Sequence, residues 1–351
     1  MRLGLNLGYL SGPDVRDQIA LAQEAERLGY SVVWAAEAYG SDAPTLLAWI
    51  AAQTERIDVG SAVMQIPART PAATAMTAVT LDAVSGGRFR LGLGVSGPQV
   101  SEGWHGVRFE RPLQRTREYV DIVERALRQE KVAYQGEHFT LPLPDGPGKA
   151  LRLMMRPVRE RIPIYLASIG PKNLELTGQI ADGWLSVFFA PEHAAESMEP
   201  IRAGREQDGR SMDGFDVVTT VPLVIGDDVA ACADEVRAYT ALYIGGMGSR
   251  EQNFYNRLAV RMGFEQAATE VQDLFLNREY RAAAAAVPQE FIDRTALIGP
   301  PERIRERLPA YAEAGVTTLT VAFTGGAETL QTRLARLRDL AEAVDAAGLA
   351  E

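Results

Sequence analysis

Two turns in this sequence have the composition of anion-binding sites. Each follows an apolar run and precedes a segment with helical periodicity. A Ser/Gly/Pro turn that opens a helix presents free N–H groups, and the helix dipole adds about half a positive charge, so such turns bind phosphate. Ordinary helix capping explains either turn alone, but two neighbouring turns make phosphate binding an equal alternative. The turns comprise Gly94, Val95, Ser96 and Gly97, and Ser168, Ile169, Gly170, Pro171 and Lys172.

Two titratable side chains are candidates for proton transfer. Glu37 follows an apolar run and lies between two alanines, which leaves open a pocket carboxylate or a solvated loop charge. His105 lies in a long loop beside Trp104. An imidazole near a ligand exchanges protons close to neutral pH, although a hydrogen-bonded structural role is the alternative. We expect the other histidines, His138 and His193, to be structural or exposed.

The elements that position these residues alternate regularly along the chain. Apolar β-like runs alternate with helix-period segments, which is typical of a parallel sheet with crossover helices. Eight such strands are the number that closes a (β/α)8 TIM barrel, whose ligands lie at the carboxyl ends of the strands. The expected strands are residues 3–8, 31–35, 57–63, 89–95, 163–168, 183–187, 217–225 and 317–323, and the expected helices include 15–28, 71–84, 113–127, 172–180 and 301–314.

The segment LDAVSGGRFRLGLGV, residues 81–95, joins a helix end to a glycine-spaced strand. Gly86 and Gly87 predict a helix C-terminus, because only glycine reaches left-handed dihedral angles at little energetic cost. Gly92 and Gly94 alternate with apolar residues, and glycine within a strand indicates close approach of backbone or ligand. We therefore expect this unit to face a cofactor.

The regular alternation is interrupted twice. Residues 130–162 are rich in glycine and proline, and their pattern predicts a hairpin at 132–141. Residues 245–299 predict two or three extra helices, including one at the alanine run 282–286. We expect one barrel domain over residues 1–351, with insertions after the fourth helix and between strands seven and eight, since decorated barrels exceed the usual 250 or so residues.

Composition excludes several classes of function. The net charge of −10 argues against nucleic acid or an anionic membrane as partner, because both require a basic surface. The single cysteine, Cys232, excludes an intramolecular disulfide, and no Cys/His spacing predicts a metal site. No apolar run reaches the roughly 20 residues of a membrane helix, and the chain opens without a basic-then-apolar leader. The expected location is cytoplasmic.

Five segments together resemble the bacterial-luciferase-like superfamily. They read LGYSVVWAAEAYGSD, DVGSAVMQIPARTP, LDAVSGGRFRLGLGVSGPQ, IYLASIGPKNLELTGQIADGW and ERLPAYAEAGV. Within the superfamily the chain is most similar to the branch that uses the deazaflavin coenzyme F420, which includes methylenetetrahydromethanopterin reductase. The resemblance covers residues 2 to about 348 and implies hydride transfer at C5 of the deazaflavin, to or from a small organic substrate.

The resemblance assigns roles by position. It implies a cis peptide between Ala62 and Val63, at a bulge that supports the deazaflavin ring, and it places Glu37 near the hydroxyl end of the ring. The two glycine-containing turns match segments that hold the phosphate and the polar tail. It also implies a homodimer, paired through helices that include residues 44–50 and 74–79. The residues that we expect around the substrate are Asn6, Tyr9, Asp42, Gln65, Trp104 and His105.

Two departures from the resemblance leave the substrate open. Ala38 occupies a position where several relatives have a histidine, which transfers the proton in the F420-dependent glucose-6-phosphate dehydrogenase, and Asn6 replaces a glutamate of the methanopterin reductase. Neither activity transfers to this chain. An FMN-dependent monooxygenase of the same superfamily and a non-catalytic deazaflavin-binding protein therefore remain as alternatives to an F420-dependent oxidoreductase.

Overall fold

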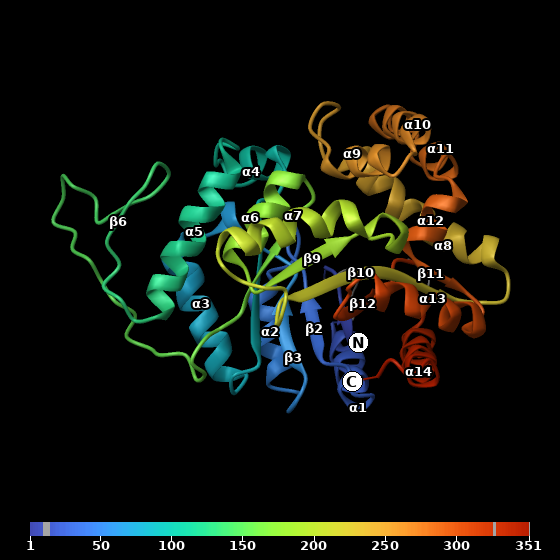
Figure 1. The fold of residues 1–351 in the computed structure, drawn as a ribbon, viewed down its shortest axis with the longest axis horizontal. Helices are drawn as coiled ribbons and strands as arrows, with labels where there is room; N and C mark the ends of the chain where they lie inside the picture. Colours follow the sequence, from blue (N-terminus) through green and yellow to red (C-terminus); the bar gives the residue numbers. More distant parts are fainter. Residues whose placement is uncertain (10–14, 326–327, 351) are drawn as a thin grey trace.

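A closed barrel of parallel strands forms the centre of the molecule (Figure 1). The computed structural model describes residues 1–9, 15–325 and 328–350. Within those residues eight strands form the ring, and the first strand pairs with both the second and the last, which closes it. The (β/α)8 barrel expected from the sequence is confirmed. Its strands are β1 (Arg2–Asn6), β2 (Val32–Ala35), β3 (Asp58–Ser61), β5 (Phe89–Gly94), β8 (Ile164–Ala167), β9 (Gly183–Val187), β10 (Asp216–Ile225) and β12 (Thr318–Ala322).

Short strands extend the ring at two places. The strand expected at 57–63 ends earlier, at Ser61, and the chain resumes pairing with β5 as β4 (Met64–Gln65). The peptide between these two pieces, Ala62–Val63, is cis, which confirms the expectation. At the other side of the barrel β11 (Leu297–Gly299) pairs with the end of β10.

Helices surround the barrel and bury its outer face. Five of them match the helices expected at 15–28, 71–84, 113–127, 172–180 and 301–314. Local signals fix the ends of the helix at 71–84: Thr70 accepts a hydrogen bond from the Ala73 N–H at its start, and Gly86 and Gly87 take positive φ angles just beyond its end. The last helix packs against the first. The surrounding helices are α1 (Arg16–Arg27), α2 (Ala43–Ala51), α3 (Pro71–Val84), α5 (Pro112–Leu127), α6 (Pro171–Ile180), α7 (Ala194–Gln207), α8 (Val229–Ala241), α13 (Pro301–Glu313) and α14 (Leu330–Ala346).

Side chains fill the barrel interior in layers. Near the amino ends of the strands, Arg90 binds Asp58 at 2.7 Å and Asp216 at 3.1 Å. Above this ion cluster, Trp34 and Tyr165 meet edge to face with ring centroids 5.3 Å apart. The interior is therefore a packed core, and a ligand has room only at the carboxyl ends of the strands, as in other barrels of this kind.

Two regions add structure outside the regular units. The first carries the antiparallel pair β6 (Tyr134–Gln135) and β7 (Thr140–Leu141) and projects from the body beside α5 (Figure 1). The second contains four α-helices among the described residues rather than the two or three expected, because the chain turns again between 262 and 288. Those helices are α9 (Phe254–Arg261), α10 (Glu265–Leu276), α11 (Tyr280–Ala285) and α12 (Gln289–Thr295). Elsewhere in the chain the shorter elements are α4 (Pro98–Gly103), the 3₁₀ turns η1 (Ile66–Ala68) and η2 (Pro191–His193), and the π-helical η3 (Leu242–Gly246).

Candidate active site

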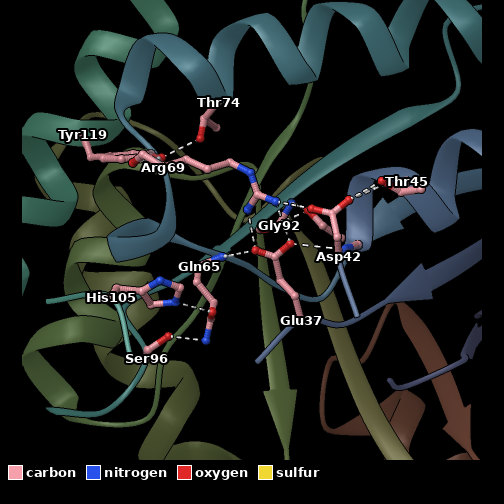
Figure 2. Close-up of polar contacts among 12 residues, drawn as sticks. Glu37, Asp42, Thr45, Gln65, Arg69, Thr74, Gly92, Ser96, His105 and Tyr119 are labelled. Atoms are coloured by element: carbon pink, nitrogen blue, oxygen red, sulfur yellow. Dashed lines mark hydrogen bonds and ion pairs between the residues drawn. The ribbon is translucent and has the colours of Figure 1, made fainter. Parts of the chain in front are cut away.

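Glu37 lies buried just after β2, and four donors surround its carboxylate (Figure 2). The backbone N–H groups of Ala43 and Gln65 each donate to it at 3.2 Å, one to each oxygen. Arg69 binds both oxygens, with Nη1 at 2.5 Å from Oε2 and Nη2 at 3.1 Å from Oε1. This carboxylate connects the segments that follow β2, β3 and β4. Its contacts therefore indicate that Glu37 holds these loops in position.

Arg69 is the centre of this ion cluster. Its Nη2 also binds Asp42 at 2.5 Å, while the Tyr119 hydroxyl donates to its carbonyl oxygen at 3.1 Å. Burial opposes the charge of Arg69, but hydrogen bonding and attraction to Glu37 outweigh it, so the pKa of Arg69 lies above its usual value. The sequence analysis did not select Arg69. The sequence feature that could have indicated Arg69 is a cation after the third strand together with acidic residues after the second strand.

A second polar group contains Gln65, Ser96 and His105. The Gln65 side-chain amide donates to the Ser96 hydroxyl at 2.9 Å, and its oxygen lies 3.0 Å from His105 Nε2 (Figure 2). Because the amide oxygen can only accept, this arrangement requires a hydrogen on Nε2 and leaves Nδ1 to accept or release a proton. The Gln65 backbone also donates to Glu37, so the two groups form one connected network.

The predicted bulge lies beside this network at the mouth of the barrel. Ala62 and Val63 pack on the apolar cluster of the barrel interior, which includes Trp34. A Cβ atom at Gly94 would lie 2.6 Å from a Val63 methyl carbon, closer than such atoms approach. Glycine at position 94 is therefore required by Val63, and this explains part of the glycine spacing in β5.

The turn after β8 borders a pocket of about 240 Å³. Ser168, Ile169 and Pro171 belong to its lining, whereas the exposed Lys172 does not. A cation reaches the pocket from α9 instead: Arg261 lines it and donates to the Ile169 carbonyl at 3.2 Å. Its remaining walls come from α6, β9, the start of α7 and α9, and consist of Leu174, Trp184, Ser186, Val187, Phe188, Phe189, Ala190, His193, Glu196, Ser197, Leu258 and Met262.

The remaining predicted pocket residues have different environments. Asn6, at the end of β1, accepts a hydrogen bond from the Gly8 N–H at 2.8 Å through Oδ1. Tyr9 is partly exposed and hydrogen-bonds to Tyr243. Burial raises the pKa of both phenols, so they stay neutral in the physiological range. Trp104 is 67% exposed at the end of α4.

An aromatic cluster from α8, η3 and α9 supports Tyr9, and the sequence analysis did not predict it. Tyr239, Tyr243 and Tyr255 pack around Phe188, which follows β9, with ring centroids 5.4 to 6.1 Å from it. Only the barrel brings these segments together, since they are separated by more than fifty residues. The cluster fixes the insertion against the rim of the barrel.

The described residues contain no group of three or more His, Cys, Asp and Glu side chains that could hold a metal ion. None of the described helices is both long enough and apolar enough to cross a membrane.

A barrel of parallel strands with a polar network and a pocket at the carboxyl ends defines a (β/α)8 protein with one ligand-binding face. The sequence profile described as luciferase-like monooxygenase matches residues 3–318. This chain belongs to that family.

Several relatives share most of their length with this chain. A Mycobacterium tuberculosis protein named as a coenzyme F420-dependent oxidoreductase is 43% identical over 351 residues, covering 98% of this chain and 99% of that protein. The 5,10-methylenetetrahydromethanopterin reductase of Archaeoglobus fulgidus is 29% identical, covering 84% and 85%. Among solved structures, the coenzyme F420-dependent tetrahydromethanopterin reductase of Methanopyrus kandleri superposes with a TM-score of 0.83 at 22% identity, covering 98% of each chain.

Proposed function

We propose that this chain is an F420-dependent oxidoreductase that transfers a hydride between the deazaflavin and a small organic substrate. The observation that carries the proposal is the network of Glu37, Gln65, Arg69 and His105 at the barrel mouth, beside Ala62–Val63. Relatives named for F420 across nearly the full length of this chain support the choice of cofactor.

The chemistry of the site fits this cofactor. A deazaflavin has a flat ring with amide-like edges, and neutral donors and acceptors such as Asn6, Gln65 and Ser96 match such edges. Its phosphate and carboxylates require positive charge. Arg261 in the pocket, Lys172 nearby and the first turn of α6 supply it.

When bound, the deazaflavin supplies or accepts a hydride at C5. The protein must then hold the ring in position and donate or accept the proton that accompanies hydride transfer. We assign ring support to Ala62, Val63 and Gly94, and the positioning of the surrounding loops to the Glu37–Arg69 pair. Hydride addition to a C=O or C=N carbon leaves negative charge on the heteroatom, and we assign delivery of the proton to His105 through Nδ1, since its Nε2 contacts Gln65.

We also propose that the protein acts as a homodimer and requires no nucleic acid. The outer faces of α2 and α3 expose Trp49 and Met76, large apolar side chains suited to contact with a second copy.

Turnover tests the proposal. Purified protein is mixed with reduced F420 and a panel of enones and imines, and formation of oxidised F420 is followed by absorbance. Substrate-dependent oxidation supports an F420-dependent oxidoreductase. Oxygen-dependent turnover with reduced FMN alone would instead identify a monooxygenase, and F420 binding without turnover on any substrate would favour the non-catalytic alternative.

A further inference from the structure

The mouth of the barrel has two chemically different halves. The loops after β2, β4 and β5 carry the polar network that joins Glu37 to His105. The aromatic cluster lies over a different part of the ring of strands, because Phe188 follows β9 and Tyr9 follows β1, with β10 and β12 between these two strands. A ligand at the mouth therefore meets charged and amide groups on one side and aromatic rings on the other.

Hydroxyl groups within the aromatic cluster are joined by hydrogen bonds. Tyr243 on η3 hydrogen-bonds to Tyr9 and to Tyr239 on α8. Each phenol carries one proton that it can donate, so two bonds among three hydroxyls leave one O–H for a ligand. Of the three, Tyr9 is the one on a barrel loop, and it is 37% exposed. The Tyr9 hydroxyl is therefore the one that a ligand at the mouth contacts.

The groups that act on these phenols are neutral. Burial raises the pKa of Tyr9, Tyr239 and Tyr255, and among the described residues the other contributions to these pKa values come from tyrosines alone. A phosphate or carboxylate binds where a cation or several N–H groups surround it, and a buried charge without such partners is costly. The phenols therefore suit an uncharged ligand.

Two cations at the mouth are engaged by other groups. Arg69 binds both carboxylate oxygens of Glu37 and also binds Asp42. Arg261 donates to the Ile169 carbonyl at the turn after β8, and we have assigned it to the polar tail of the cofactor. Neither guanidinium supplies the aromatic half of the mouth with a charge for an anionic substrate.

Phe188 connects the aromatic cluster to the barrel through an unusual backbone conformation. Its φ is +53°, in the left-handed region that bulky side chains rarely adopt. Residues held in such conformations are concentrated at functional sites. The buried Phe188 ring lies 5.4 Å from the ring of Tyr243 and 6.1 Å from that of Tyr255, measured between centroids. This packing gives the phenols a fixed position at the mouth.

We propose that the aromatic cluster is the substrate-binding side of the mouth and selects an uncharged, flat carbonyl compound, whose oxygen accepts a hydrogen bond from Tyr9. Aromatic rings pack well against flat apolar molecules, and a phenol donates to a neutral acceptor. Tyr243 is a positioning residue, because its hydroxyl orients that of Tyr9. The inference rests on the proposed function, since it names the substrate class of the same site.

Binding to the protein loaded with oxidised F420 tests the proposal. The oxidised cofactor has no hydride to give, so a carbonyl compound binds without being reduced. Calorimetry compares cyclohex-2-enone with 4-oxocyclohex-2-ene-1-carboxylate, which is the same ring with an added charge. We expect the neutral enone to bind about tenfold more tightly, because the cluster offers no cation to the carboxylate.

Two variants that lack one hydroxyl each test the hydrogen bond. Tyr9→Phe and Tyr243→Phe should each raise the Kd of the enone about three- to tenfold, the range for one neutral hydrogen bond, and leave F420 affinity unchanged. Tyr280→Phe, on α11 and 53% exposed, is the matched control and should bind the enone as the wild type does. Thermal unfolding verifies that the variants fold, and if one does not, the other variant and the comparison of the two ligands decide.

Turnover with reduced F420 separates this inference from the proposed function. Both variants should raise KM for the enone with kcat unchanged, as expected when a hydrogen bond contributes equally to the ground state and the transition state. If F420 does not bind, the proposed function fails. With F420 bound, tighter binding or faster turnover of the carboxylate, no binding of either ligand, or wild-type affinity for the enone in the variants would overturn this inference and leave the choice of cofactor intact.

Discussion

Arg69 binds both carboxylate oxygens of the buried Glu37, at 2.5 and 3.1 Å, in a side-by-side arrangement (Figure 2). The same guanidinium binds Asp42, which caps the start of α2. Bidentate pairs of this kind are short and directional. The pair therefore sets the relative positions of the loops after β2 and β4, which hold Gln65 against His105.

Removal of Arg69 should destabilise the protein strongly. Arg69→Met leaves the buried Glu37 carboxylate without its partner, and breaking such a pair costs about 3–5 kcal/mol. Urea unfolding measures this loss. The double variant Glu37→Gln/Arg69→Met should recover part of it, because no buried charge remains. If the single and double variants are equally destabilised, the ion pair is not the source of the effect.

His105 should control a proton-transfer step. His105→Gln is expected to lower kcat by about 10²- to 10⁴-fold with a smaller change in KM, since general acid catalysis contributes about that much. Gln65→Leu should shift the pH profile of kcat, because it removes the acceptor that holds the imidazole. His138→Gln, a change in the hairpin between β6 and β7, is the control. Unchanged kcat in His105→Gln would assign this histidine a structural role.

Local signals explain which parts of the fold are predictable from the sequence. The interval 71–84 matches α3 at both ends because its start and stop residues, Thr70 and Gly86, lie beside it in the chain. The hairpin expected at 132–141 likewise contains β6 and β7. The number of helices between 245 and 299 was wrong, because the turn between α10 and α11, formed by Asn277, Arg278 and Glu279, contains no glycine or proline.

The site is predictable only where the order of the strands determines which residues meet. Gln65 ends β4 and Ser96 lies just after the neighbouring β5, so the order of the barrel strands brings them together. Arg69 escaped prediction because its pairing with Glu37 joins residues 32 positions apart, and the type of residue does not reveal the partner. Arg261 reaches Ile169 from an insertion 92 residues away, which no strand pattern locates.

Two cations near the β8 turn should contribute to cofactor affinity. Lys172→Ala and Arg261→Gln are each expected to weaken F420 binding by about 1–3 kcal/mol, the range for a charge-assisted hydrogen bond. Arg261 should have the larger effect, because it lines the pocket and Lys172 does not. Calorimetric titration measures both. Arg257→Gln, on the same helix as Arg261 but outside the pocket lining, is the control. Unchanged affinity in both test variants would show that the polar tail of F420 does not bind in this pocket.

Acid should weaken the contact between α1 and α14. Hydrogen bonds from Arg27 and Arg338 lower the pKa of Glu24 from 4.5 to about 2, despite some opposing desolvation. Since the folded pKa lies below the unfolded value, this contribution is complete above about pH 4.5 and disappears as the pH falls towards 2. Thermal midpoints of the wild type and Glu24→Gln should therefore converge between pH 5 and about 2. A constant difference across that range would contradict this assignment.

Cofactor preference tests the central claim most directly. Wild-type protein is titrated with oxidised F420 and, separately, with FMN, and binding is followed by the absorbance change of each chromophore and by calorimetry. The account predicts saturable binding of F420 with at least tenfold higher affinity than that of FMN, and loss of this preference when Arg261 and Lys172 are both replaced. Tighter binding of FMN than of F420, or no saturable binding of F420 by folded protein, would contradict it.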